Sequence, residues 1–298
     1  MTKKYLFLFF ATVFGFMNSL SAQEATGGDT AAAKTPGAWT IKNTVLFSAE
    51  QSLFNNWAQG GISSLSIGAN YKGFFNFKKG KHAWDNTIEL GYGIVRQDLN
   101  KKGVFDKGNH FQKNEDKIEL NTSYSLKAIS DWNYNATLNL KSQFDDGYNK
   151  DSVLVASFFS PAYLISSVGM ELKKPTYYIL LSCFTGKTTF VGDARLAKPG
   201  NFGLEEGETN WHFALGSYVK LQYQKDIFKN VNLLSKLELF YDYATNLAHT
   251  DVNWEVFVMM KINSYLNAFV NFQMIFDRDF SEQIQWKQRA GISIPLSF

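Results

Sequence analysis

Apolar and polar residues alternate along most of the chain with a period of two. The segment 132–144 shows this clearly, with Trp132 and Leu138 on one face and Asn133 and Lys141 on the other. Successive side chains of an extended strand point to opposite faces, so this period predicts β-strands with one apolar and one polar face. No segment has convincing helical spacing, and the sequence therefore predicts an all-β fold.

Twelve such runs can be marked along the chain. They lie near residues 38–48, 62–77, 82–98, 115–129, 132–145, 160–172, 176–190, 210–225, 231–243, 251–262, 265–276 and 283–298. Most exceed the roughly 5 to 6 residues typical of strands in soluble sheets and suffice for a tilted membrane crossing of about 9 to 11 residues. Single-chain outer-membrane barrels have an even number of strands, so we expect an up-and-down antiparallel transmembrane β-barrel of about 12 strands.

The connections between these runs alternate between short and long. Short joins such as "KKGK" at 78–81 and "DIFKN" at 226–230 alternate with long ones such as "LNKKGVFDKGNHFQKN" at 99–114. Every second connection of an up-and-down barrel lies at the same end, so all tight turns are predicted at one end and all long loops at the other. If both termini are periplasmic, the tight turns face the periplasm and the long loops face outward.

The two ends of the chain indicate where in the cell the protein is located. Lys3 and Lys4 precede an apolar run followed by small residues, which predicts a cleaved signal peptide at 1–22, a flexible periplasmic linker at 23–37 and a barrel at 38–298. The last run ends on Phe298 and resembles the carboxy-terminal strand of outer-membrane barrels, which the barrel-insertion machinery recognises. We therefore expect export to the cell outer membrane, with that machinery and the membrane lipid as partners.

Composition leaves two architectures open. Apolar residues make up 45% of the chain and aromatic residues 16%, but charged residues only 19%, so either the core or the outer surface is aromatic. A soluble lipocalin-like barrel is the structural alternative, because the period does not say which face looks outward. The polar faces are rich in Asn, Ser, Thr, Gln and Gly, as a lumen is. Aromatic residues also gather near strand ends, as in membrane girdles: Phe75, Phe77, Trp84, Trp132 and Tyr134 at one rim, and Phe144, Trp211, Tyr241, Tyr243 and Trp254 at the other.

Several function classes are disfavoured. Past the signal no apolar run approaches the roughly 18 residues of a spanning helix. The single Cys183 excludes an internal disulfide and a cysteine-based metal site. The net charge of +3 is small and the lysines sit mostly in turns, so a nucleic-acid partner is not expected.

The stretch "FNNWAQGG" at 54–61 falls between the first two expected strands, at the outer end. In one interpretation Asn55, Asn56 and Trp57 fold into the mouth of the barrel and contact a ligand. In the other, Gly60 and Gly61 supply backbone freedom for a hairpin connection while the tryptophan sits at the lipid rim. The second interpretation is favoured, because hairpins need Gly-rich connections.

The segments "NNWAQGGISSLSIGANY", "SPAYLISSVGMELKKP" and "TGKTTFV", with the long alternating strands, carry a family resemblance. The chain resembles a family of uncharacterised outer-membrane barrels found in Bacteroidetes, known as a domain of unknown function. The resemblance covers essentially the whole mature chain. It implies an outer-membrane location and no established chemistry, so no catalytic residue can be carried over.

The sequence offers little for catalysis, and neither enzymatic activity nor a cofactor is expected. A hydrolase would need a nucleophile with a positioned base, and only a constellation of His212, a loop serine and Asp193 could be assembled. Carboxylates crowd the outer loops, at Asp145, Asp146, Glu205, Glu206, Glu208, Asp277 and Asp279. They could bind a divalent cation, but such groups more often keep loops hydrated, and no metal site is predicted.

The polar faces define the candidate lumen. It is predicted to be lined by Glu89, Glu119, Asn121, Asn135, Asn139 and Lys141. The expected function is a narrow pore or small-solute pathway. The alternatives are a structural barrel whose outer loops contact a protein partner, an outer-membrane hydrolase, and a soluble lipocalin-like periplasmic binder.

Overall fold

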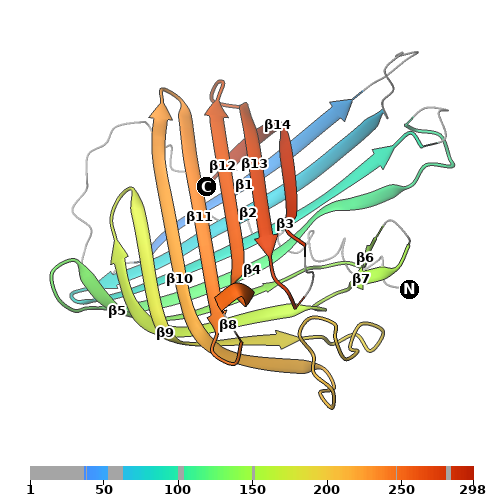
Figure 1. Cartoon of the computed structure of the whole chain (residues 1–298). Helices are drawn as coiled ribbons and strands as arrows, with labels where there is room; N and C mark the ends of the chain where they lie inside the picture. The colour runs from blue at the N-terminus through green and yellow to red at the C-terminus, as the bar shows by residue number, and fades with distance from the viewer. Residues whose placement is uncertain are drawn as a thin grey trace. The chain divides into compact units, whose positions relative to one another are not determined.

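Twelve antiparallel strands form a closed barrel in which the first strand, β1, pairs with the last strand, β14 (Figure 1). The computed structural model describes residues 37, 39–52, 63–99, 104–149, 152–245, 247–279 and 283–298. The barrel strands are β1 (Trp39–Ser52), β2 (Ser64–Lys79), β3 (His82–Gln97), β4 (Phe111–Lys127), β5 (Trp132–Ser142), β8 (Ala162–Lys173), β9 (Tyr177–Phe190), β10 (Trp211–Phe228), β11 (Val231–Asp242), β12 (Asp251–Lys261), β13 (Asn267–Phe276) and β14 (Gln285–Ser297). The predicted fold class is confirmed, and each expected run corresponds to one barrel strand.

Apart from the closing pair of β1 and β14 and from one insertion, neighbouring strands in the barrel are neighbours in sequence. Between β5 and β8 the chain forms a small separate hairpin of β6 (Gly147–Tyr148) and β7 (Leu154–Ala156), which the alternation did not predict. A single turn of 3₁₀ helix, η2 (Leu247–His249), precedes β12. In the part of the chain that the structure describes, no helix is long and apolar enough to cross a membrane.

The two ends of the barrel differ in their connections. The joins that follow β2, β4, β8, β10 and β12 are short, and we call their side the tight-turn end. The joins that follow β3, β5, β9, β11 and β13 are longer and lie at the opposite end, here the long-loop end. Positive φ angles at Gly80 (57°) and Asn230 (64°) fall in two of the tight turns, where a left-handed residue reverses the chain within a few residues.

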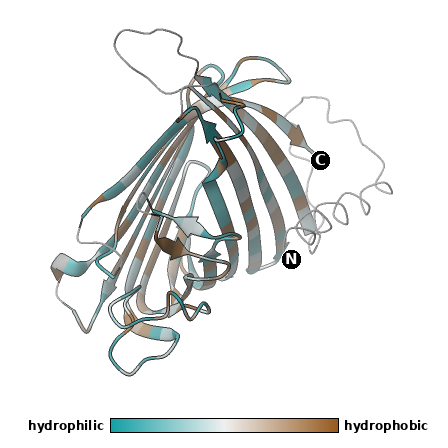
Figure 2. Cartoon of the chain, turned by 90° about the vertical axis from the view of Figure 1, so that its right-hand side faces the viewer, coloured by the Kyte–Doolittle hydropathy of each residue, from teal (hydrophilic) through white to brown (hydrophobic). Residues whose placement is uncertain are grey.

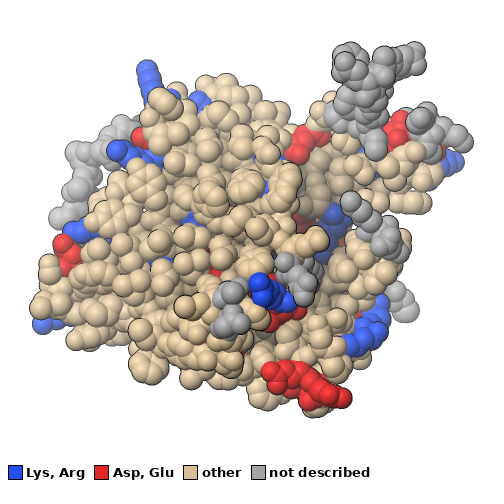
Figure 3. Space-filling model, viewed as in Figure 1, with Lys and Arg blue, Asp and Glu red and all other residues tan. Residues whose placement is uncertain are grey.

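The outward face of the barrel is apolar. Leu138 on β5 is 49% exposed, whereas the next residue, Asn139, points inward and is 2% exposed. Bands of hydrophobic and hydrophilic residues alternate along the strands in Figure 2. On the face drawn in Figure 3 uncharged residues form most of the surface, and charged residues lie mainly near its edges. A monomer in water rarely exposes so much contiguous apolar surface, so this exterior needs an apolar surrounding.

Aromatic side chains pack together near both ends of the strands. At the tight-turn end the Trp39 ring lies 5.4 Å from Phe77 and 5.6 Å from Trp84, centroid to centroid. The indole nitrogen of Trp84 donates a hydrogen bond to the Thr122 hydroxyl, 2.8 Å away. At the long-loop end Tyr241 and Tyr243 make an edge contact at 5.8 Å, and both belong to the predicted second rim. An amphipathic aromatic ring suits a boundary between apolar and wet surroundings.

β9 is irregular, and this changes which of its residues point inward. Its pairing shifts register against β8 between Val168 and Met170 and against β10 between Gly216 and Tyr218. Ser182 organises the irregularity, since its hydroxyl donates to the Val168 carbonyl at 2.8 Å and accepts from Thr185 at 2.8 Å. One extra residue is thereby inserted, as in a β-bulge, and the inward face passes from even-numbered positions to odd-numbered ones.

The barrel wall approaches very closely at two glycines beside β9. A Cβ atom on Gly216 would lie 2.0 Å from the Tyr241 carbonyl oxygen, and one on Gly169 would lie 2.1 Å from the Leu181 carbonyl oxygen. No side chain fits at those distances, so these two positions require glycine.

Candidate functional site

Charged side chains meet inside the barrel near the middle of the strands. Glu89 on β3 binds Lys72 on β2, and its second oxygen lies 2.7 Å from Lys117 Nζ on β4. Lys117 Nζ also lies 2.9 Å from Glu119. These groups come from three adjacent strands at neighbouring register positions, which is why the alternation brings them to one place.

A second group of charges is centred on Glu238 of β11. Its two oxygens accept Lys141 Nζ from β5 and Lys220 Nζ from β10, the latter at 2.9 Å. Asn253 on β12 donates to it at 3.4 Å. Lys141 and Glu238 belong to strands that are not neighbours, so this pair reaches across part of the interior.

Lys236 on β11 connects the first of these groups to the opposite wall of the barrel. Its Nζ lies 3.5 Å from Glu89 and 3.9 Å from Glu255 on β12. β11 and β3 are opposite strands, with β10, β9, β8, β5 and β4 between them on one side and β12, β13, β14, β1 and β2 on the other. The ion-pair network is defined by these residues: Lys72, Glu89, Lys117, Glu119, Lys141, Lys220, Lys236, Glu238 and Glu255. It therefore spans the interior from wall to wall.

A further pair crosses between β14 and β4. Arg289 binds Glu115, and its second terminal nitrogen lies 3.5 Å from Glu50 on β1. Lys287 Nζ lies 3.8 Å from the same Glu115 oxygen that Arg289 binds. Buried charges require compensation of this kind, because removal from water costs several kcal/mol per ion.

A cavity of about 680 Å³ lies inside the barrel beside this network. Its lining runs from Lys117, Lys236 and Arg289 to the tight-turn end, where Lys174 and Thr176 of the β8–β9 turn also line it. The cavity therefore joins the charged middle of the barrel to one of its ends.

The six residues of the predicted lumen all point inward in this arrangement. Glu89, Glu119, Asn121 and Asn139 line the cavity. Lys141 binds Glu238. Asn135 is buried and donates to Ser123 at 2.7 Å and to Glu171 at 3.0 Å. Sequence reasoning did not single out the partners of these groups, such as Lys236 and Glu238, because pairing across the barrel is not visible in the sequence of one strand.

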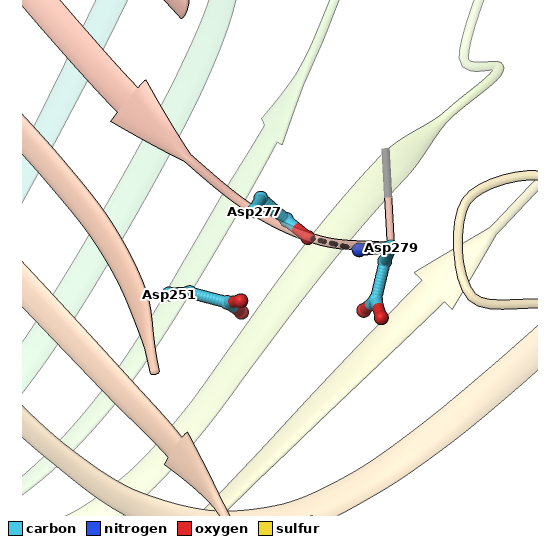
Figure 4. Close-up of side chains that lie close together, drawn as sticks. All are labelled: Asp251, Asp277 and Asp279. Carbon is cyan, nitrogen blue, oxygen red and sulfur yellow. Dashed lines mark hydrogen bonds between the residues drawn. The ribbon is translucent and has the colours of Figure 1, made fainter. Parts of the chain in front are cut away.

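A second charged cluster lies at the long-loop end. Asp251 begins β12, and Asp277 and Asp279 follow β13 (Figure 4). Carboxylate oxygens of the three lie within 4.8 Å of one another. Lys187 Nζ, which faces inward because of the β9 bulge, lies 2.6 Å from Asp251, 3.2 Å from Asp277 and 3.3 Å from Asp279. The ammonium group offsets part of the negative charge of the three carboxylates.

The connection between β9 and β10 has a small core of its own. Val191, Leu196, Phe202 and Leu204 are buried against one another. Asp193 in this loop binds the Arg195 guanidinium at 2.6 Å, and this hydrogen-bonded pair holds the pKa of the Asp193 carboxyl well below its usual range. Loop residues that form their own core keep a defined shape over the end of a barrel.

The residues of the suggested hydrolytic constellation have other neighbours. His212 Nδ1 lies 3.1 Å from a Glu208 oxygen, and Asp193 binds Arg195. The Ser160 hydroxyl accepts a hydrogen bond from the Asp193 backbone nitrogen at 2.9 Å. In each of the two side-chain pairs an acidic group contacts a basic one at the long-loop end.

The candidate loop residues Asn55, Asn56, Trp57, Gly60 and Gly61 lie outside the described residues. The predicted signal peptide and almost all of the linker do so as well. Their roles stay predictions.

Comparison with known proteins gives a partial family match and distant structural similarities. Residues 49–148 match the model of a family described as a protein of unknown function (DUF3078). This part contains "NNWAQGGISSLSIGANY" but neither of the other two motifs of the resemblance. No curated protein has a matching sequence.

Three solved structures illustrate the structural similarities. An outer-membrane channel from Pseudomonas putida F1 is 10% identical with a TM-score of 0.43, covering 92% of this chain and 100% of that one. Outer membrane phospholipase A from Escherichia coli is 8% identical with a TM-score of 0.40, covering 85% and 95%. The translocator domain of the autotransporter NalP from Neisseria meningitidis is 11% identical with a TM-score of 0.34, covering 89% of each chain. Similarities this distant identify no activity.

Proposed function

We propose that this chain is an outer-membrane barrel that provides a narrow pathway for small polar solutes. The outer-membrane location is supported by a closed barrel with an apolar exterior and aromatic side chains near both ends of its strands. In this proposal residues 1–22 are removed on export, and the insertion machinery recognises β14. The tight turns face the periplasm.

The pathway is supported by one observation above all. The interior holds a cavity of about 680 Å³ at the place where a core would otherwise be packed, and many charged and amide side chains belong to its lining. Interiors of small barrels are commonly filled by their own side chains, whereas a polar, hollow interior suits water and solutes. The ion-pair network crosses the pathway near its middle and would form its constriction.

Location and folding are tested together by cell fractionation and by gel migration of unheated and heated protein. Recovery with the outer membrane and faster migration of the unheated band are the expected results. A soluble periplasmic protein without a mobility shift would contradict the membrane barrel and would favour a lipocalin-like binder.

Conduction is tested with purified, folded protein in planar bilayers. We expect steady unitary currents in KCl that are small compared with those of open porins, because charged side chains meet across the interior. Bilayers that contain folded protein and carry no current would contradict the pathway. They would favour the alternative of a structural barrel whose long loops contact a partner protein.

A further inference from the structure

Apolar side chains of β1, β2, β12 and β13 point into the cavity, at positions where alternation would place polar ones. Phe257 and Met259 on β12 and Phe269 on β13 occupy inward positions and line the cavity. Leu46 on β1 and Phe74 on β2 join them from the neighbouring part of the wall. In a water-filled pore these positions are normally polar, so the apolar lining needs its own explanation.

Two of these residues form an aromatic platform. The Phe257 and Phe269 rings are stacked, with centroids 6.0 Å apart and planes inclined by 17°. Phe269 is 7% exposed, so its ring is held in place by its surroundings, and Phe257 beside it is half-buried. A ring fixed in this way offers an adjacent aromatic group a face to pack against, at little cost in side-chain entropy.

The part of the wall that lies opposite β12 and β13 is mainly polar. β3, β4 and β5 contribute Thr87, Asn121, Ser123, Thr137 and Asn139 to the same cavity. Asn139 is 2% exposed, and its amide nitrogen donates to Glu119 at 3.1 Å, while its amide oxygen has no hydrogen-bond partner among the described residues. The amide oxygen of Asn76 on β2, another lining residue, is also buried and has no partner in the part of the chain that the structure describes. Buried acceptors of this kind favour a ligand that carries hydroxyl or amide donors.

The volume of the cavity and its extent along the barrel suit a small-molecule ligand. A volume of about 680 Å³ falls within the range of roughly 300 to 1,000 Å³ typical of ligand sites. The cavity reaches the tight-turn end and borders the ion-pair network at the other side, so a ligand entering from that end would stop at the charged constriction.

We propose that this cavity is a binding site for a small aromatic solute with hydroxyl or amide groups. The aromatic ring packs on Phe257 and Phe269, and the polar groups bond to the amides of Asn139 and Asn76. This names the substrate class of the proposed pathway and rests on it, although binding itself can be measured without conduction.

The test uses 4-nitrophenyl β-D-glucoside, a water-soluble probe with one ring and several hydroxyls. Equilibrium dialysis compares its binding to the folded barrel in lipid nanodiscs with its binding to empty nanodiscs. We expect binding above the empty discs and a loss of at least about fivefold in affinity when Phe257 and Phe269 are both replaced by leucine. Leucine keeps the apolar volume and removes the rings.

Matched controls separate the site from the membrane surface. Phe272 lies on β13 like Phe269 but packs outside the barrel against Trp254 and Trp286, and Phe272→Leu should leave probe binding unchanged. Methyl β-D-glucoside, which lacks the ring, should compete weakly. Folding of each variant is checked by heat-modifiable migration, and Phe257→Tyr, which retains the ring, should keep binding.

Three results would overturn the inference. These are no probe bound by the wild-type barrel, equal binding by the double leucine variant, and equal competition by the methyl glucoside. A barrel that binds the probe but carries no current would contradict the proposed pathway and leave the site standing. A barrel that conducts but binds no probe would support the pathway and contradict the binding site.

Discussion

Lys236 Nζ lies 3.5 Å from Glu89, although their strands stand on opposite sides of a twelve-stranded barrel. A contact between opposite walls places opposite charges at the centre of the interior, where a solute would have to pass. The ion-pair network around it contains five lysines and four glutamates. Removal of one lysine therefore removes the excess of positive charge at the constriction.

Replacement of Lys236 by methionine should make the pathway more cation-selective. Glu89 keeps Lys72 and Lys117, but Glu255 loses an ammonium group 3.9 Å away, and the network becomes less positive. The reversal potential of bilayer currents in a KCl gradient should move toward that of K⁺. Lys229→Met, at the exposed β10–β11 turn, is the control and should cause little change. An equal shift in both variants would exclude the constriction as the cause.

Arginine should be costly on the outer face and tolerated on the inner face. Leu120 on β4 is 39% exposed and points outward, and the next residue, Asn121, lines the cavity. Leu120→Arg should lower the free energy of unfolding by about 2 to 4 kcal/mol if it lies at the bilayer midplane. Asn121→Arg should cost much less, since Glu119 and water are near. Urea unfolding in lipid vesicles measures both, and equal costs would contradict the assigned faces.

Gly216→Ala should destabilise the wall beside β9. The new Cβ would lie 2.0 Å from the Tyr241 carbonyl oxygen, so the backbone of β10 or β11 must move, which typically costs about 1 to 3 kcal/mol. At Gly147 the nearest atoms are side-chain atoms 3.3 and 3.4 Å away, and Gly147→Ala is the matched control. The temperature at which the folded gel band disappears should fall for the first variant only. A similar fall in both would show that the clash is not the reason.

Lys187→Met should create a cation site that the wild-type chain does not need. Without the ammonium group, Asp251, Asp277 and Asp279 keep their oxygens within 4.8 Å of one another and repel. Added Ca²⁺, which prefers carboxylate oxygens, should raise the unfolding temperature of the variant and leave the wild type unchanged. Asp279→Asn in the same background should weaken the effect. Stabilisation of the wild type by Ca²⁺ would contradict the role given to the lysine.

The strands could be predicted from the sequence because each carries its own period. Leu138 beside Asn139 is enough to assign the two faces of β5 once an apolar surrounding is assumed. Asp277 and Asp279 could be counted among the outer-loop carboxylates from the sequence, because both lie in a predicted long connection. Asp251 was not counted with them, since only the pairing of β12 with β13 brings it near them.

Other features depend on contacts that no single segment reveals. The β9 bulge changes which positions of the strand point inward. Assigning faces by alternation from Leu180 therefore puts Lys187 on the wrong face. The inward Phe257 and Phe269 break the polar pattern of their strands, and a search for lumen residues by polarity passes over them. The ion pairs between distant strands follow from closure of the barrel, which fixes which strands face each other across the interior.

The pairing of β1 with β14 joins residues 44–49 to residues 292–297, near the two ends of the barrel sequence. During synthesis β1 is therefore made first and its final partner last. A sheet that lacks either strand cannot close, so its edge strands keep hydrogen-bonding groups without partners, and such edges attract other chains. The risk of aggregation thus lasts for as long as the polypeptide is in transit, and protection in that interval has to come from something other than the barrel itself.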